Sequence, residues 1–195
     1  CQKQDSDKYF GIHHCFHSKK TCRLRFKEKD IMRTTETNSV VFFISKQYPE
    51  PKFRPVVAAW QLITPENIGN LIRVADNVGA QQVFILGDEF HLRISTVKKT
   101  AGLSFNNVQL VFISSEKFFE TMDPEYQLVA IETSKQSVNL FGVSLPEKVA
   151  FILGNERNGL PEEILGKCPL HVHIPMTGQC KSMNVSHALA VTLFE

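Results

Sequence analysis

Short runs of apolar residues alternate along this chain with stretches of helical spacing, and the alternation strongly limits the folds that the chain can adopt. Seven such runs, rich in Val, Ile and Phe, cover residues 40–44, 56–62, 83–86, 108–113, 128–131, 149–153 and 171–174. Strands that alternate with helices predict an α/β domain with a mainly parallel sheet. Most of the runs are almost entirely apolar, which is typical of strands covered by helices on both faces of the sheet.

One helix has signals at both of its ends. Thr64 can cap it, Pro65 fits the first turn because the missing N–H is not needed there, and Gly79 provides a left-handed stop. Gly69, within the helix, predicts a close approach of the helix backbone to a neighbour or a ligand. Apolar residues recur at spacings of three and four, which predicts a buried stripe of Ile68, Leu71, Ile72, Ala75 and Val78.

A second helix is predicted near the end of the sequence. Ser182 has a hydroxyl that can cap it, and its apolar positions include Val185, Leu189 and Phe194. Because no stop signal precedes Glu195, we expect the sequence to end inside or at the edge of this helix, as it would if a C-terminal continuation were missing.

Composition excludes several classes of protein. The chain has 195 residues, and its longest apolar run, residues 40–44, is far shorter than the roughly 20 residues that a membrane span needs. The 22 Lys and Arg residues nearly balance the 20 Asp and Glu residues, so a nucleic-acid partner would have to bind a local basic patch. The five cysteines include no C-x-x-C pair, which indicates reduced thiols and a cytoplasmic protein.

The N-terminal part differs from the rest of the chain. Residues 1–38 are polar and show neither the helical nor the strand periodicity of apolar residues. They contain a basic block made of Lys19, Lys20, Arg23, Arg25, Lys27 and Lys29. We interpret residues 1–50 as a basic arm or a fragment of a further domain, and residues 51–195 as the main domain. The arm also holds the metal-ligating residue types His13, His14, Cys15, His17 and Cys22. Their spacing matches no common zinc pattern, so a solvated loop is favoured and no metal is predicted.

Three loops that follow predicted strands hold small and polar residues. Ligands of a parallel sheet bind beyond the carboxyl ends of its strands, so these loops are the first candidates for a site. The first loop, residues 63–73, leads into the capped helix and contains Asn67 and Arg73.

The second loop, residues 153–161, has Gly154 and Gly159 at the spacing of a phosphate-binding P-loop. The loop does not match an NTPase, because Leu160 and Pro161 stand where a P-loop needs Lys and Ser or Thr. No G-x-G-x-x-G follows any strand, so a dinucleotide site has no support. A tight strand-to-helix turn is the alternative interpretation of this loop alone.

The third loop, within residues 171–186, follows a strand that ends at Pro175. A glycine-bearing stretch comes next, and Ser182 and Asn184 then open the second helix. Free backbone N–H groups and small polar side chains therefore gather in one place. Helix capping explains Ser182 but leaves Asn184 without a role.

In this order and at these separations, the three segments resemble the signature motifs of the SpoU/TrmH family of RNA 2'-O-ribose methyltransferases, in the SPOUT superfamily. The resemblance extends from about residue 56 to residue 195. The matching positions are Asn67-x-Gly69-x-x-x-Arg73, Leu153-Gly154-Asn155-Glu156-x-x-Gly159-Leu160, Ile174-Pro175-Met176 and Ser182-Met183-Asn184-Val185-Ser186.

The resemblance implies a mainly parallel α/β sheet with helices on both faces and a C-terminal deep trefoil knot, which few folds have. It also implies a homodimer and a site for S-adenosylmethionine among the loops of the knot. By similarity, the cofactor-binding residues are Ile131, Thr133, Gly154, Asn155, Ile174, Met176, Ser182 and Met183. Their apolar side chains and backbone groups suit an adenine ring.

The implied reaction is transfer of a methyl group to a ribose 2'-hydroxyl. The protein must align the hydroxyl with the methyl group and help remove its proton. The resemblance assigns this step to Arg73, with the site organised by Asn67, Glu156, Ser182 and Asn184. Since guanidinium is normally always protonated, two roles stay open for Arg73: proton acceptor with help from an RNA phosphate, or electrostatic stabiliser of the forming alkoxide.

The expected substrate is RNA, with tRNA the first choice and rRNA the second. Arg93, Lys98 and Lys99 form a small basic group that could contact phosphates, although solvated surface lysines explain it equally well. The alternative from another class is a non-catalytic RNA-binding or scaffold module that keeps the knotted, cofactor-binding fold.

Overall fold

The structure is a computed structural model that describes residues 42–43, 45–46, 48, 51–87 and 92–195. Contacts within the chain divide it into two units, Cys1–Pro49 and Glu50–Glu195. In the first unit, Phe42 and Phe43 are helical, so the strand predicted over residues 40–44 is wrong there. A short apolar run fits either structure by periodicity alone. The rest of that run, the N-terminal basic block and the candidate metal ligands lie outside the described residues.

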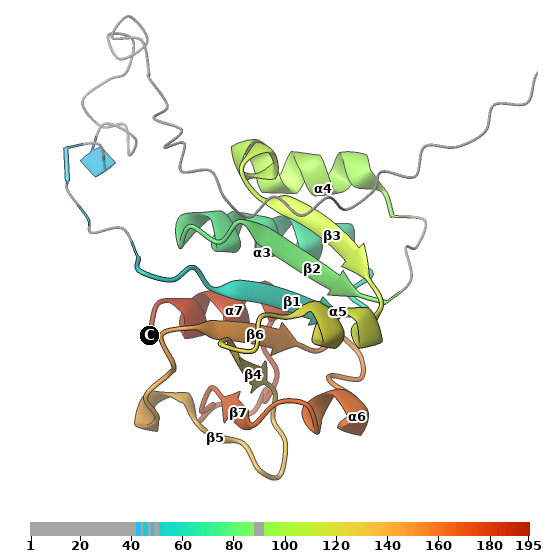
Figure 1. Ribbon diagram of the computed structural model, residues 1–195, viewed down its shortest axis with the longest axis vertical. Helices are drawn as coiled ribbons and strands as arrows, with labels where there is room; N and C mark the ends of the chain where they lie inside the picture. Colours follow the sequence, from blue (N-terminus) through green and yellow to red (C-terminus); the bar gives the residue numbers. More distant parts are fainter. Residues whose placement is uncertain (1–41, 44, 47, 49–50, 88–91) are drawn as a thin grey trace, which may run out of the picture. The chain divides into compact units, whose positions relative to one another are not determined.

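The second unit contains a seven-stranded sheet in which every strand pair is parallel (Figure 1). The strands lie in the order β3-β2-β1-β6-β4-β7-β5. This confirms the predicted α/β class with a mainly parallel sheet. The strands are β1 (Val56–Trp60), β2 (Gln82–Leu86), β3 (Gln109–Ile113), β4 (Gln127–Ile131), β5 (Val138–Asn139), β6 (Val149–Leu153) and β7 (Leu170–His173).

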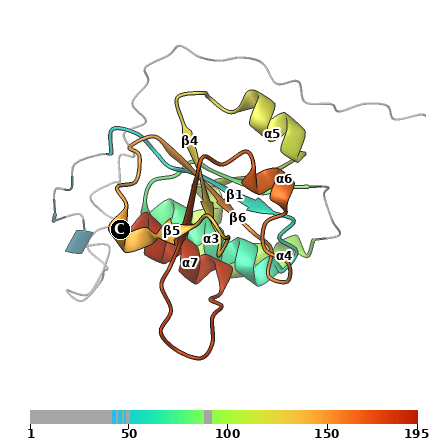
Figure 2. The ribbon, with the colours of Figure 1, turned by 90° about the horizontal axis from the view of Figure 1, so that it is seen from below.

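Helices cover both faces of the sheet, as the apolar runs predicted (Figure 2). The helices are α3 (Pro65–Asn77), α4 (Ile94–Ala101), α5 (Ser115–Thr121), α6 (Glu162–Leu165) and α7 (Val185–Leu193), with 3-10 turns η1 (Gly102–Asn106) and η2 (Leu140–Gly142). One core cluster joins α3, α4 and α7 to the first face, and a second joins α5 and α6 to the other. Every residue of β6, in the interior of the sheet, is buried.

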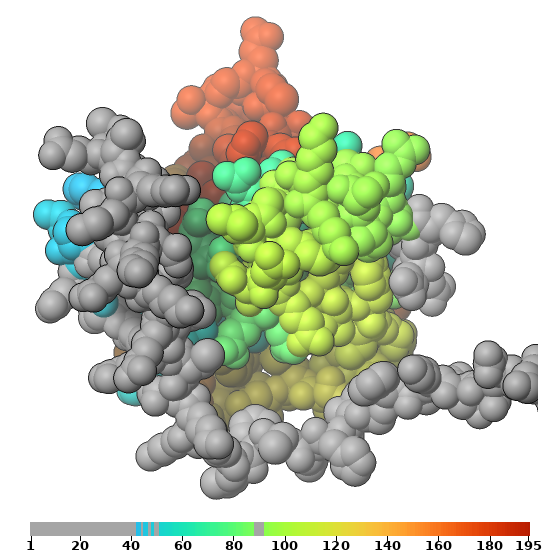
Figure 3. All heavy atoms as spheres, turned by 90° about the horizontal axis from the view of Figure 1, so that it is seen from above, coloured from blue at the N-terminus to red at the C-terminus, as the bar shows by residue number. Residues whose placement is uncertain are grey.

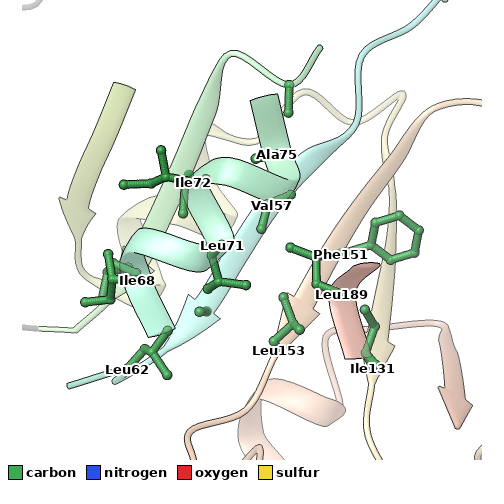
Figure 4. Packing of buried hydrophobic residues seen from close by; sticks show 14 of the residues in the cluster. Val57, Leu62, Ile68, Leu71, Ile72, Ala75, Ile131, Phe151, Leu153 and Leu189 are labelled. Carbon is green, nitrogen blue, oxygen red and sulfur yellow. The ribbon is translucent and has the colours of Figure 1, made fainter. Parts of the chain in front are cut away.

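The apolar stripe of α3 packs on the sheet as its spacing predicts (Figure 4). Ile68, Leu71, Ile72 and Ala75 are fully buried, and Thr64 and Gly79 bound the helix as expected. Gly79 has a φ of 73°, in the left-handed region that favours glycine. The Thr64 side chain makes no capping hydrogen bond, so Pro65 is the stronger start signal.

Gly69 lies where α3 crosses α4. A Cβ atom at Gly69 would be 2.6 Å from the Cβ of Thr100 and 2.9 Å from the carbonyl oxygen of Val97. The predicted close approach is therefore to a neighbouring helix and not to a ligand.

The start of α7 differs from the prediction, and Phe194 lies beyond its end. The N-cap is Asn184, whose Oδ1 accepts a hydrogen bond from the backbone N–H of Ser186, and Ser182 lies in the preceding loop. The helix ends at Leu193, and Phe194 beyond it is 66% exposed. The loop between β7 and α7 protrudes beyond the helices (Figures 2 and 3). Within the described ranges, no helix combines the length and the apolarity needed to cross a membrane.

Candidate active site

A cavity of about 610 Å³ opens at the carboxyl ends of β4, β6 and β7, beside the starts of α3 and α7. All three loops singled out in the sequence contribute to its walls. It is lined by Thr64, Asn67, Ile131, Glu132, Thr133, Leu153, Gly154, Asn155, Glu156, Arg157, Gly159, Val172, His173, Ile174, Met176, Lys181, Ser182, Met183, Asn184, Val185 and Ala188. The candidate site residues all lie in this set except Arg73.

Three polar side chains from three elements form a connected network at one end of the cavity. The Nδ2 of Asn67, in the first turn of α3, donates a 2.9 Å hydrogen bond to Oε1 of Glu156. The Nδ2 of Asn184 donates a 2.8 Å hydrogen bond to Oδ1 of Asn67. Asn67 is only 8% exposed, so each of its polar atoms needs a partner, and the network supplies one to each.

The carboxyl group of Glu156 is held in its ionised form. Its partial burial raises the pKa, but hydrogen bonds from the side chains of Thr64 and Asn67 outweigh that effect and bring the net pKa below the ordinary value of 4.5. The cavity therefore presents a carboxylate beside the Asn67 amide at neutral pH.

The loop between β6 and α6 closes on itself beside this carboxylate. Asn155 and Gly159 form an antiparallel bridge, with backbone hydrogen bonds of 3.4 and 3.2 Å. The side chain of Asn155 also accepts from the backbone N–H groups of Arg157 and Asn158. A side chain at Gly154 would overlap the backbone of Gly159. The turn itself therefore requires glycine at 154, in agreement with the alternative interpretation of this loop as a tight strand-to-helix turn. Gly154 also borders the cavity.

Apolar side chains and a folded loop also line the cavity. Ile131, Leu153 and Val172 lie at the ends of adjacent strands and are buried. The Nζ of Lys181 donates a 2.7 Å hydrogen bond to the carbonyl oxygen of Met176, which draws the two sides of the protruding loop together. The cavity thus combines an apolar floor with polar and charged walls.

Arg73 lies outside the cavity. It is six residues after Asn67 on α3, which places it about 9 Å further along the axis and on another side of the helix. Its side chain is exposed, and Nη1 donates to the carbonyl oxygen of Thr100 at 3.5 Å. Within the described chain, the structure does not bring Arg73 together with the other candidate catalytic residues.

Sequence reasoning missed several residues of the site. Glu132 follows β4 directly, between the predicted cofactor-binding residues Ile131 and Thr133, and it hydrogen-bonds the backbone of the 154–160 loop. Thr64, Arg157, His173 and Lys181 also line the cavity. Arg157 stands at an unassigned position within the second motif, and the other three lie within three residues of a motif position. The unassigned and flanking positions of the motifs are therefore the signal that would have found them. Nowhere in the described ranges do three His, Cys, Asp or Glu side chains gather as a possible metal site.

Comparison with known proteins identifies the family. The model of the SpoU rRNA Methylase family matches residues 54–194, which include the sheet and the whole cavity. The chain belongs to the SpoU family.

Named SpoU-type relatives act on two classes of RNA. The tRNA (guanosine(18)-2'-O)-methyltransferase of Aquifex aeolicus (strain VF5) is 28% identical over 145 residues, which are 72% of this chain and 67% of that protein. The 23S rRNA (guanosine-2'-O-)-methyltransferase RlmB of Xylella fastidiosa (strain 9a5c) is 30% identical over 133 residues, which are 67% of this chain and 53% of that protein. The chain thus spans between half and two thirds of the length of these relatives.

A solved structure with the same fold contains the cofactor. The AdoMet-bound rRNA methyltransferase from Sinorhizobium meliloti superposes with a TM-score of 0.66 at 27% identity, covering 76% of this chain and 57% of that one.

Proposed function

We propose that this chain transfers a methyl group from S-adenosylmethionine to a ribose 2'-hydroxyl of RNA, with tRNA as the first substrate class and rRNA as the second. Membership of the SpoU family and the named activities of its relatives support the reaction. The observation that carries the proposal is the Glu156–Asn67–Asn184 network at the edge of a cavity built from the three motif segments.

The residues of the cavity fit S-adenosylmethionine. Its volume of about 610 Å³ lies within the usual range for small-molecule sites. The apolar floor of Ile131, Leu153 and Val172 offers a surface for an adenine ring. Glu156 and Lys181 provide charges of both signs, which suits a ligand that carries a carboxylate, an ammonium and a sulfonium group.

The protein has two tasks in this reaction. The cofactor, when bound, supplies an already activated methyl group. The side chains must orient the ribose hydroxyl and accept or stabilise the charge that develops on its oxygen. Asn67 is fixed by Glu156 and Asn184, so we propose that it positions the nucleotide, with Ser182 beside it on the cavity wall.

Arg73 keeps the two roles that the sequence left open, proton acceptor or stabiliser of the alkoxide. Its place outside the cavity requires either that bound RNA bring it to the hydroxyl or that a second copy of the chain supply it. We also propose a homodimer, which is the arrangement that the second of these alternatives needs. Exposed apolar side chains such as Phe141 and Phe194 are available for a contact between copies. In sedimentation we expect a species of twice 22.1 kDa, and a single 22.1 kDa species would contradict the dimer.

The deep trefoil knot is also a proposal. It is supported by the position of β7, which comes last in the sequence but lies between the earlier strands β4 and β5. When single molecules are stretched from both ends, the end-to-end length of the unfolded chain should be shorter than that of 195 fully extended residues, because a tightened knot keeps part of the chain. Full extension would contradict the knot.

The remaining expectations follow from the RNA substrate. We propose that residues 1–50 form an arm that contacts RNA phosphates, and that the protein works in the cytoplasm. Removal of the basic block should weaken RNA binding and reduce its salt dependence, while S-adenosylmethionine affinity stays unchanged. An unchanged RNA affinity would contradict the arm's role.

Transfer of labelled methyl groups tests the function directly. The protein is incubated with labelled S-adenosylmethionine and unmodified total RNA, and the alkali-resistant linkages are mapped. We expect label at a ribose in tRNA, and loss of that label with Arg73→Ala. Equal transfer by Arg73→Ala would remove Arg73 from the mechanism. Cofactor binding in calorimetry without any transfer to RNA would instead support the non-catalytic scaffold.

A further inference from the structure

Glu132 is fixed to the sheet at its backbone. It is the first residue after β4, and its N–H donates a 3.0 Å hydrogen bond to the carbonyl oxygen of Val172 in β7. Its backbone is therefore tied to the neighbouring strand, and the residue lines the cavity. The mechanism proposed above gives it no role.

The carboxylate of Glu132 contacts the 154–160 loop, which follows β6. Its Oε2 accepts a 2.9 Å hydrogen bond from the backbone N–H of Leu160, and its Oε1 accepts one of 2.9 Å from the backbone N–H of Thr133. Leu160 is buried, so its N–H would lack a partner without this oxygen. Each carboxylate oxygen thus has its own backbone donor.

Because Gly159 has no side chain, the carboxylate of Glu132 fits beside its backbone. A Cβ atom there would overlap Oε2 of Glu132, and the φ of 66° at Gly159 also favours glycine. The neighbouring turn is closed by the Asn155–Gly159 bridge, which makes the 154–160 loop one connected unit. Glu132 is the side chain that connects this unit to the end of β4.

The same carboxylate stands between two cavities. Glu132 and Thr133 are the residues shared by the first cavity and a second one of about 620 Å³ beside α6. In the first cavity, the end of β4 and the glycines of the loop both contribute to the wall. The hydrogen bond from Leu160 to Glu132 therefore fixes the separation of these two parts.

We propose that Glu132 is a positioning residue, whose carboxylate holds the 154–160 loop against β4 and thereby sets the affinity of the first cavity for its cofactor. This inference rests on the proposed function only for the identity of the ligand. Glu132 acts through the loop and need not touch the reacting atoms. Removal of the carboxylate frees the loop and opens the wall toward the second cavity.

Two substitutions test the inference. Glu132→Ala removes both acceptors, and Glu132→Gln keeps one, because an amide nitrogen cannot accept from a backbone N–H. Without any cofactor, hydrogen exchange at the Leu160 amide should accelerate by about tenfold or more in Glu132→Ala. The dissociation constant for S-adenosylmethionine in calorimetry should rise by about tenfold, or about 1.4 kcal/mol, with Glu132→Gln between wild type and Glu132→Ala.

The kinetic pattern separates positioning from catalysis. At saturating cofactor, kcat should remain within about threefold of wild type, since the loss is in ground-state binding of the cofactor. The control is Glu163→Gln, which alters an exposed glutamate on α6 that lines neither cavity. It should leave both the exchange and the affinity unchanged.

The outcomes distinguish this inference from the function. Unchanged exchange at Leu160, or a cofactor affinity within about twofold of wild type in both Glu132 variants, overturns the positioning role. If the wild type does not bind S-adenosylmethionine, the proposed function fails. The exchange rate at Leu160 then still decides whether Glu132 holds the loop. Should Glu132→Ala fail to fold, Glu132→Gln changes a single group and provides the same measurements.

Discussion

The side-chain amide of Asn184 donates a 2.8 Å hydrogen bond to the side-chain oxygen of Asn67, although the two residues are 117 positions apart in the sequence. The Oδ1 of Asn184 also accepts from the backbone N–H and the hydroxyl of Ser186, at 2.9 and 2.7 Å. One asparagine therefore caps α7 and connects it to the first turn of α3. The contact between the two helices and the cap of α7 depend on the same side chain.

Asn67→Asp should disable this site. The substitution replaces the donor that faces Glu156 with a second negative oxygen, in a position that is largely buried. We expect methyl transfer to fall by about 100-fold, as misplacement of a catalytic group commonly does, and the free energy of unfolding to fall by about 1–3 kcal/mol. Radiolabel transfer and urea denaturation measure the two effects.

The matched control for this prediction is Asn77→Asp. It makes the same chemical change at an exposed position of the same helix, so activity should stay within about twofold of wild type. Wild-type transfer by Asn67→Asp would show that the network does not matter for the reaction.

The pKa of Glu156 gives a prediction for acid. Folding lowers this pKa below 4.5, so the folded state favours the ionised form. The resulting stabilisation is complete above about pH 4.5 and is lost as the pH falls through the folded-state pKa. Glu156→Gln lacks it at every pH. Denaturation is measured from neutral pH to about pH 3. The free energy of unfolding of the wild type should exceed that of Glu156→Gln by an amount that shrinks as the pH falls, and a difference that grows would contradict the lowered pKa of Glu156.

The two described cysteines should react very differently. Burial raises the pKa of Cys168 to about 12, while the side chain and backbone of Ser182 lower the pKa of exposed Cys180. Because the thiolate is the reactive form, iodoacetamide should modify Cys180 and leave Cys168 intact in the folded protein. S-adenosylmethionine should slow the reaction at Cys180, since Ser182 lines the cavity. Peptide mass spectrometry measures both rates, and equal rates at the two thiols would refute this prediction.

Gly69→Ala tests the crossing of α3 and α4. Alanine normally stabilises a helix interior by about 1 kcal/mol relative to glycine. Here its methyl group would meet Thr100 and Val97, so we expect a net loss of about 1–2 kcal/mol in the free energy of unfolding. Gly178→Ala, with no atom within 4 Å of the added group, should be neutral or slightly stabilising. A gain in stability for Gly69→Ala would contradict the close contact.

Most of the fold was predictable because its signals are local. Pro65 and Gly79 bound α3, and the apolar runs at 128–131 and 149–153 became interior strands. The two-residue strand β5 has too little sequence to show a period. At α7, both Ser182 and Asn184 are good caps, and the path of the preceding loop decides in favour of Asn184.

The site was less predictable, because it depends on how distant segments meet. Motif spacing placed Asn67 and Arg73 together, but six residues of helix turn them to different sides. Glu132 lies between the predicted site residues Ile131 and Thr133, but its own contact could not be predicted, since it is made with Gly159 and Leu160, almost thirty residues later. A contact between a side chain and a remote backbone leaves no periodicity for a sequence to show.

The most direct test is hydrogen exchange of the whole chain with and without S-adenosylmethionine. In the proposed mode of binding, the end of β4, the 154–160 loop and residues 174–184 surround one small molecule. We predict that slowed amide exchange appears in all three segments together and is half-maximal at the calorimetric dissociation constant. Exchange that is unchanged in these segments, or slowed only beside the second cavity, would contradict the account.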